Sequence, residues 1–261
     1  MQGKFIHWPQ LITKLRKFNF KMKNFLLVIP ARYKSKRLPG KPLLEIKGVP
    51  MIIRTFNQCK KVVNHSDILV ATDHKKIFNL CRRKKINVLM TSNKCLTGTD
   101  RIAEVSKKIK KKFYINVQGD EPFCNPKDIK KIIYYANKYP DKIINGYTEI
   151  KDKHIFNSPN IPKVLFKLNG DLIYMSRAPI PSNKKKTFIK AWRQVCIYSF
   201  PYNSLQVFSK LKRKTPIEQI EDLELNRFIE IGYNIKMIKM SDKSIAVDTK
   251  ADLKKIKKLL N

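Results

Sequence analysis

Short apolar segments of strand length alternate with segments of helical spacing along the first half of the chain. Repeated β-α units of this length predict a parallel, doubly wound sheet with helices on both faces. The α/β class therefore follows from the order of the elements. Strands are predicted from residue 25 to a break at Pro30 and at 68–72, 86–90 and 113–117, and helices at 49–63, 74–85, 99–111 and 126–139.

The second half of the chain has a different pattern. Residues 163–168 and 172–176 flank Asn169-Gly170, a favoured two-residue hairpin turn. A strand is expected at 194–200, one periodic acidic helix at 216–231, and a final strand and helix at 235–240 and 248–260. We interpret the region of about 145–200 as a hairpin subdomain inserted into the main sheet of a domain that spans 24–261.

Residues 1–23 form a basic N-terminal extension outside this domain. They contain no long apolar core and no small-residue cleavage site, so a signal peptide is disfavoured. One alternative is a partly amphipathic segment on a membrane surface. The favoured interpretation is that Met22 is the natural start and that residues 1–23 are disordered or loosely packed.

The chain is strongly basic, with 56 Lys and Arg against 20 Asp and Glu and a net charge of +36. Such a charge suggests a nucleic-acid-binding protein. However, lysines dominate and form runs in predicted helix faces and loops, at 110–112, 184–186 and 254–258. We therefore favour a solvated basic surface that attracts anionic substrates, and expect no nucleic-acid partner.

Other features of the composition bear on location. No apolar stretch approaches the ~20 residues of a membrane span, so stable membrane insertion is not expected. The five cysteines are scattered, with no C-x-x-C motif and no zinc-type spacing. Free thiols in a reducing compartment, and hence a cytoplasmic location, are the preferred interpretation.

The first predicted strand ends in a basic loop. Gly40 lies within it, between Pro39 and Lys41, and would let a backbone approach a ligand closely. A buried strand followed by cations and a glycine is typical of polyphosphate binding in α/β proteins. The loop matches neither the Walker motif nor the dinucleotide fingerprint. Its cations are Arg32, Lys34, Lys36, Arg37 and Lys41.

Polar residues also follow the predicted strands at 68–72 and 113–117. Asp73 ends the first of these, and Gln118-Gly119-Asp120-Glu121-Pro122 follows the second. Ligands bind beyond the carboxyl ends of parallel strands, so Asp120 would face the polyphosphate loop and could hold Mg²⁺. The alternative, that Asp120 or Glu121 caps the helix near Pro126, is disfavoured because Asp120 lies too far ahead of it.

Two further segments carry polar groups at helix starts. In Thr97-Gly98-Thr99-Asp100-Arg101, Thr99 is the expected helix cap, but capping does not explain Gly98 or Arg101. Asp248 precedes the last helix, where capping and metal binding are equally favoured. The four histidines lie in no motif with a nucleophile, so a Ser/His or Cys/His triad is disfavoured.

Six segments occur in the order and spacing of the CMP-sugar-acid synthetases: IPARYKSKRLPGKPL, ATDH, TGTDRIAEV, NVQGDEP, SRAPIP and AVDTKADL. From about residue 22 onward the chain resembles this family, and most closely the 3-deoxy-manno-octulosonate (Kdo) cytidylyltransferases. The resemblance implies that CTP and a 2-keto-3-deoxy sugar acid give a CMP-sugar and pyrophosphate. It also implies Mg²⁺, a homodimer formed through the hairpin, and a product destined for lipopolysaccharide or capsule.

The resemblance also implies roles for individual residues. Arg32, Ser35, Arg37 and Lys41 would hold the triphosphate, Thr97, Gly98 and Arg101 would lie by the cytidine, and Asp120 and Asp248 would bind Mg²⁺. Because phosphoryl-type transfer depends on positioning and charge neutralisation, we expect Lys41, Arg37 and Asp120 to be the catalytic residues.

The expected sugar pocket departs from the family pattern at two positions. Gln118, Arg177, Tyr198 and Glu224 match residues that contact the sugar acid, and Arg177 is a suitable partner for its carboxylate. Gln194 stands where Kdo enzymes usually have His, and Leu225 where they usually have Gln. We therefore expect the substrate to be Kdo or a close analogue, with an amino-Kdo or a sialic-type nonulosonic acid as the alternative.

Overall fold

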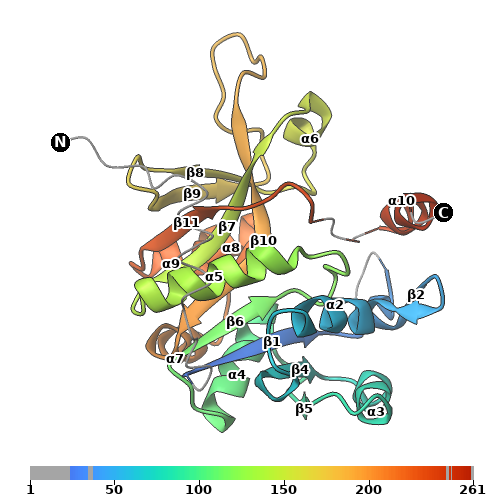
Figure 1. The fold of residues 1–261 in the computed structure, drawn as a ribbon. Coiled ribbons are helices and arrows are strands. Elements are labelled where there is room, and N and C mark those ends of the chain that lie inside the picture. The colour runs from blue at the N-terminus through green and yellow to red at the C-terminus, as the bar shows by residue number, and fades with distance from the viewer. Residues whose placement is uncertain (1–23, 35–37, 245–246, 248, 260–261) are drawn as a thin grey trace.

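The computed structural model describes residues 24–34, 38–244, 247 and 249–259. A nine-stranded sheet forms the centre, with the order β11-β7-β10-β6-β1-β4-β5 and with β8 and β9 attached through β10 (Figure 1). Along the order from β11 to β5, six of the seven strands run in one direction and β10 opposes its neighbours β6 and β7. The predicted α/β class with a mostly parallel sheet is confirmed.

In the first half of the chain the helices and strands follow the predicted alternation, and in the second half a strand at Ile143–Ile150 and helices at Lys153–Asn157 and Tyr202–Lys210 occur that were not predicted. The strands of the large sheet are β1 (Phe25–Ala31), β4 (Ile68–Thr72), β5 (Val88–Met90), β6 (Phe113–Val117), β7 (Ile143–Ile150), β8 (Lys163–Phe166), β9 (Leu172–Ser176), β10 (Ala191–Pro201) and β11 (Ile235–Lys239). The α-helices are α2 (Met51–Lys60), α3 (Lys75–Arg83), α4 (Gly98–Lys108), α5 (Pro126–Lys138), α6 (Lys153–Asn157), α7 (Tyr202–Lys210), α8 (Pro216–Glu221), α9 (Glu224–Glu230) and α10 (Lys250–Leu259). Two 3₁₀ turns, η2 (Lys41–Leu43) and η3 (His65–Asp67), and the small strands β2 (Glu45–Ile46) and β3 (Val49–Pro50) complete the described elements.

Each face of the sheet supports its own hydrophobic core. Along β1, Phe25, Leu27 and Ile29 pack with α2, α3 and α5, while Leu26 and Val28 pack with α4, α7 and α9. This division follows from the period of two along a strand, and all seven residues of β1 are buried because both faces are covered. The β1 strand is thus held rigidly, and its carboxyl end is a firm base for the loop that follows.

The predicted single helix at 216–231 is wrong. It is two short helices, α8 and α9, separated where Asp222 adopts a left-handed conformation with φ of 51°. The carbonyls of Glu221 and Asp222 both accept hydrogen bonds from the Arg177 guanidinium. The break turns α9 so that Glu224 begins a new helix.

The predicted hairpin is present. Strands β8 and β9 pair in antiparallel fashion around Asn169-Gly170, with Gly170 at φ of 85°. Lys163 also pairs with Arg193 of β10, so the hairpin is joined to the large sheet. Its role as a dimerisation subdomain stays a prediction.

The predicted extension at 1–23 lies outside the described residues. Within the described parts of the chain, none of the helices has the length and apolarity needed to cross a membrane.

Candidate active site

The candidate site lies at the carboxyl edge of β1, β4 and β6. These strands are adjacent and parallel, so the residues after each one, Arg32, Asp73 and Gln118, begin loops at the same edge. The crevice beyond the carboxyl ends of such strands is where open α/β sheets bind ligands. The structure therefore places these three predicted loops together.

The basic loop folds back on itself through Tyr33 and Gly40. The N–H of Gly40 donates to the Tyr33 carbonyl at 3.0 Å, and Gly40 has a left-handed φ of 66°. The Tyr33 ring stacks on His74, with 3.8 Å between the ring centroids. A Cβ on Gly40 would lie in van der Waals contact with the Tyr33 ring at 3.4 Å, but the backbone of that residue would be strained at this positive φ.

This fold-back brings Lys41 to Asp120. The Lys41 Nζ lies 2.5 Å from Asp120 Oδ2, and the two side chains are 12% and 29% exposed. Seventy-nine residues separate them in the chain. A cation and a carboxylate that remain partly open to solvent can both act on a polyphosphate: the ammonium on its oxygens and the carboxylate through a divalent cation.

Asp120 is held by a tight turn. A Cβ on Gly119 would lie 2.7 Å from the Pro30 carbonyl oxygen, so only glycine allows this approach of the two chain segments. Thr55 Oγ1 donates to the Gly119 carbonyl at 3.2 Å, and the N–H of Val247 donates to the Asp120 carbonyl at 3.0 Å. The position of Asp120 is therefore set by the backbone around it.

The alternative helix-cap role of Asp120 is excluded. Asn125 caps α5, with its side chain accepting from the N–H of Lys127. Among the described side chains, no three His, Cys, Asp or Glu residues form a ready metal cluster. The partly exposed Asp120 carboxylate beside the basic loop nevertheless fits Mg²⁺, which is commonly bound through one or two carboxylates and the phosphate oxygens of a substrate.

The segment 97–101 forms the start of α4. Thr97, not the predicted Thr99, is its cap: Thr97 Oγ1 accepts from the N–H of Asp100, and the Asp100 carboxylate accepts from the N–H of Thr97. Arg101 is nearly fully buried and donates to Asp73 Oδ2 at 3.0 Å and to Thr91 Oγ1. Arg101 therefore joins α4 to the end of β4.

Glu224, at the start of α9, connects two of the predicted motifs. Its carboxylate accepts from the N–H of Thr99 at 3.0 Å and from Gln118 Nε2 at 3.2 Å. Burial raises the pKa of Glu224 above its ordinary value, and the hydrogen bond from the Thr99 N–H opposes that shift. Tyr198 is buried, and burial raises the pKa of its hydroxyl well above the usual range.

Gln194, a predicted sugar-contact residue, is hydrogen-bonded within the protein. Gln194 is buried, and its Nε2 donates to Asn145 Oδ1 at 3.1 Å. The Asn145 Nδ2 in turn donates to the carbonyls of Val195 and Ile197, on either side of a β-bulge in β10. Gln194 thus supports the bulge that precedes Tyr198.

Arg177 clamps the turn before α9. Its Nε and Nη2 donate to the carbonyls of Glu221 and Asp222 and its Nη1 to that of Pro159. A guanidinium has five N–H groups, and the contacts within the described residues use three of them.

Comparison with known proteins identifies the family. The model of the family described as "Cytidylyltransferase" matches residues 26–245, most of the chain. The chain belongs to the cytidylyltransferase family.

Relatives within this family are similar over nearly the whole chain. The mitochondrial 3-deoxy-manno-octulosonate cytidylyltransferase of Arabidopsis thaliana is 38% identical, with 89% of this chain and 82% of the relative covered. The Escherichia coli 3-deoxy-manno-octulosonate cytidylyltransferase is 34% identical, with 92% and 97% covered. These matches confirm the resemblance to the Kdo cytidylyltransferases.

A solved structure of the same kind of enzyme has a similar fold. CMP:2-keto-3-deoxy-manno-octonic acid synthetase complexed with CTP superposes with a TM-score of 0.83 at 34% identity, covering 91% of this chain and 98% of that one. A cytidylyltransferase from Leptospira borgpetersenii, at 15% identity and a TM-score of 0.58, shares the fold.

In this cytidylyltransferase Arg32 begins the basic loop at the carboxyl end of β1, and the other predicted site residues fall into three groups. Lys41, Asp120, Gln118, Glu224 and the segment 97–101 are linked by the contacts above. Arg177, Gln194, Tyr198 and the fully buried Leu225 lie in the framework on the β10 and α9 side. Ser35, Arg37 and Asp248 lie outside the described residues.

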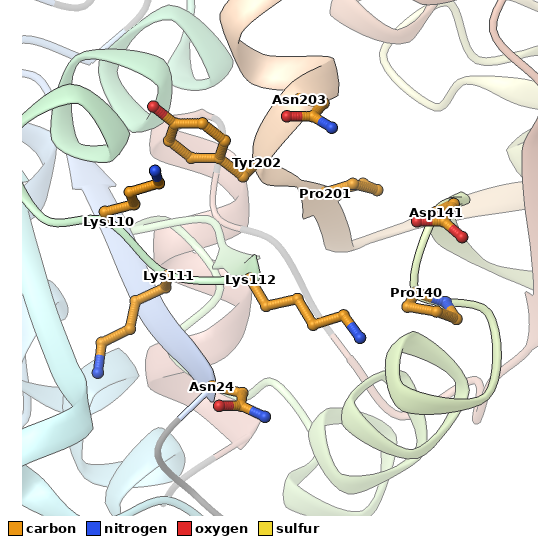
Figure 2. A pocket seen from close by; sticks show the side chains of 9 residues that line it. All are labelled: Asn24, Lys110, Lys111, Lys112, Pro140, Asp141, Pro201, Tyr202 and Asn203. Carbon is orange, nitrogen blue, oxygen red and sulfur yellow. The ribbon is translucent and has the colours of Figure 1, made fainter.

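A basic pocket of this cytidylyltransferase lies away from the candidate site. It has a volume of about 520 Å³ and is lined by Asn24, the lysines at 110–112, Tyr202 and Asn203, among others (Figure 2). Asn24 and Lys112 directly precede β1 and β6, so the pocket is at the amino edge of these strands. It is therefore at the opposite edge of the sheet from the candidate site.

Sequence reasoning missed the partners that hold the site together. Asp73 was expected at the edge but not as the acceptor for Arg101, and Arg227 and Glu218 were not singled out. A lone arginine in an otherwise acidic helical stretch was the available signal for Arg227.

Proposed function

We propose that this chain transfers CMP from CTP to the anomeric hydroxyl of Kdo or a close analogue and releases pyrophosphate. The single observation that carries the proposal is the Lys41–Asp120 pair, 2.5 Å apart at the carboxyl edge of the sheet. It is supported by relatives named 3-deoxy-manno-octulosonate cytidylyltransferase.

Lys41 would stabilise the charge that develops on the α-phosphate when the sugar hydroxyl attacks. An ammonium already in place requires little reorganisation as the transition state forms. Arg32, and the undescribed Ser35 and Arg37, would hold the rest of the triphosphate. Asp120, with Asp248, would hold Mg²⁺, which when bound supplies positive charge to the same phosphate oxygens.

The sugar acid would contact Gln118 and Glu224, whose side chains are hydrogen-bonded to each other. Both side chains are polar and stand next to the Thr97-Gly98 turn, which we assign to the cytidine side. A site that bonds sugar hydroxyls discriminates strongly against ligands that lack them. The two N–H groups of Arg177 that contacts within the described residues do not use would be available for the sugar carboxylate.

We also propose a homodimer formed through the β8–β9 hairpin in a reducing, cytoplasmic compartment. Ile173 on β9 is half exposed, and Leu168 beside the hairpin turn is fully exposed. The five cysteines are all free thiols. Light scattering after size-exclusion chromatography should give twice the chain mass, and a monomer at micromolar concentration would contradict this assembly.

The test of function is pyrophosphate release with each of the four nucleoside triphosphates, Mg²⁺ and a panel of sugar acids. Release should require CTP together with Kdo or an eight-carbon analogue. Release only with a nine-carbon acid would instead support a sialic-type substrate. No release with any acid would contradict the proposed activity.

Gln194 offers a narrower test of the sugar. If this position sets the preference, Gln194→His should raise kcat/KM for Kdo relative to an amino-Kdo, because the two side chains offer different hydrogen-bonding groups. Ratios equal to those of the wild type would show that Gln194 only supports the bulge through Asn145.

A further inference from the structure

Helix α9 contacts the start of α4 at two points that are one helical turn apart. Glu224 accepts from the N–H of Thr99 at 3.0 Å. Arg227, three residues later on the same face of α9, donates from Nη1 to Asp100 Oδ1 at 2.9 Å. Consecutive residues of α4 are thus held by successive turns of α9.

The Arg227 guanidinium has little freedom to move. It is fully buried, and its Nε and Nη2 donate to the two oxygens of the fully buried Glu218 at 2.5 and 2.7 Å. Its centre lies 3.9 Å from the centroid of the Phe208 ring. A planar, permanently charged guanidinium that is held by Glu218, Asp100 and Phe208 keeps a fixed position.

Asp100 connects Arg227 to the Thr97-Gly98 turn through hydrogen bonds to both. Asp100 Oδ2 accepts from the N–H and the Oγ1 of Thr97 at 2.8 and 2.7 Å. The adjoining Gly98 lies against the Gln118 side-chain amide. A Cβ added at Gly98 would be only 3.3 Å from both Nε2 and Oε1 of Gln118. The turn and Gln118 therefore depend on where Arg227 holds Asp100.

The same segment is held from its other side by Arg101. Arg101 donates to Asp73 Oδ2 at 3.0 Å, and Asp73 Oδ1 accepts from the N–H of Tyr33 in the basic loop at 3.4 Å. Residues 97–101 are therefore linked to the basic loop on one side and to α9 on the other.

We propose that Arg227 is a positioning residue that sets the distance between the nucleotide side and the sugar side of the site. This inference rests on the proposed function, in which the turn at 97–98 faces the cytidine and Glu224 and Gln118 face the sugar acid. Arg227 acts through Asp100 and touches neither substrate. Stability alone is a weak reason for such a group, since buried ion pairs are often replaceable by apolar residues without loss.

The test uses the double variant Glu218→Gln/Arg227→Met, which removes the buried pair without leaving Glu218 as an uncompensated charge. Arg227→Lys is the conservative variant: it keeps the charge but loses the fork that reaches both acids. Lys214→Met is the matched control, because Lys214 pairs with Asp222 between α8 and α9, and none of the hydrogen bonds and ion pairs among the described residues joins it to residues 97–101.

In the double variant, kcat/KM for the sugar acid should fall about ten- to hundredfold, because a small misplacement of one reactant is costly. The Kd for CTP measured by calorimetry should rise by no more than about threefold, because the turn beside the cytidine loosens while the basic loop keeps its contacts and its hold on the triphosphate. The kcat/KM of Arg227→Lys for the sugar acid should lie between those of the double variant and the wild type. The kcat/KM of Lys214→Met should match that of the wild type. An unchanged kcat/KM in the folded double variant, or equal losses for CTP and sugar acid, would overturn the inference.

A second readout does not depend on turnover. Hydrogen–deuterium exchange should be faster at the N–H groups of residues 97–100 in the double variant than in the wild type or in Lys214→Met. Equal protection in all three would overturn the inference even if no sugar acid proved to be a substrate. Faster exchange together with an inactive wild type would instead uphold the role of Arg227 in placing this segment and contradict only the proposed reaction.

Discussion

At the scale of single residues, the site combines groups that the sequence indicates with partners that it does not. Lys41 and Asp120 were predictable, because each follows a strand whose neighbours share one sheet edge. The cap of α4 was misplaced by two residues, since Thr97 and Thr99 are both plausible caps and only Thr97 has Asp100 at the third helical position. Arg227 was missed because its partner Asp100 is 127 residues away.

The first prediction concerns Asp120. Asp120→Asn should reduce turnover by at least about a hundredfold, because the amide keeps the shape but loses the negative charge that a divalent cation requires. The fold should be unaffected, since Asp120 is partly exposed and its backbone contacts remain. Steady-state pyrophosphate release and a thermal melt check both points, and near-normal activity in a folded variant would refute the metal role.

At the scale of elements, the strands and helices of the first half of the chain were predictable from periodicity, whereas β7, α6 and α7 in the second half were not predicted. The acidic segment 216–231 keeps its helical spacing across the break, so the pattern conceals Asp222 and the Arg177 contacts that divide α8 from α9. The antiparallel direction of β10 between β6 and β7 has no sequence signal either, because strand order depends on long-range pairing.

Two glycines allow a matched test of the turn that carries Asp120. Gly119→Ala should lower stability by about 1–3 kcal/mol and also lower turnover, because the new Cβ would collide with the Pro30 carbonyl and displace Asp120. Gly48→Ala, at φ of 67° with open space around it, should cost about 1 kcal/mol from backbone strain and leave turnover unchanged. Equal effects of the two changes on activity would show that the Pro30–Gly119 approach does not position the site.

The hairpin contains a buried lysine whose titration should be measurable. Lys163 donates to the carbonyls of Ser158 and Arg177, and burial lowers the pKa of its ammonium to about 8. Between that value and the ~10.4 of an unfolded lysine, the unfolded chain binds more protons than the native state. The contribution of Lys163 to the free energy of unfolding therefore rises with pH across this window.

Urea denaturation at several pH values checks this sign. Lys163→Met should be destabilised at pH 7 by about 1–3 kcal/mol because two carbonyls lose their donor. Its deficit relative to the wild type should grow as the pH rises through the window. A deficit that is constant or shrinks would mean that Lys163 keeps an ordinary pKa in the folded protein.

At the scale of the whole molecule, the fold unites groups from three distant parts of the chain at one edge of the sheet. Hydrogen bonds to the surrounding structure hold each of these parts: the basic loop, the turn at Gly119-Asp120, and the helices α4 and α9. The large positive charge of the chain favours the approach of anionic molecules in general and does not specify which ones.

The most direct measurement follows the α-phosphorus of CTP. With CTP labelled at the α-phosphate, Mg²⁺ and Kdo, the label should move into a sugar-linked CMP product, while label at the γ-phosphate should appear only in pyrophosphate. Label recovered as free CMP, or retained in CTP under conditions where the folded protein binds CTP, would contradict the claim that this edge of the sheet catalyses cytidylyl transfer to a sugar acid.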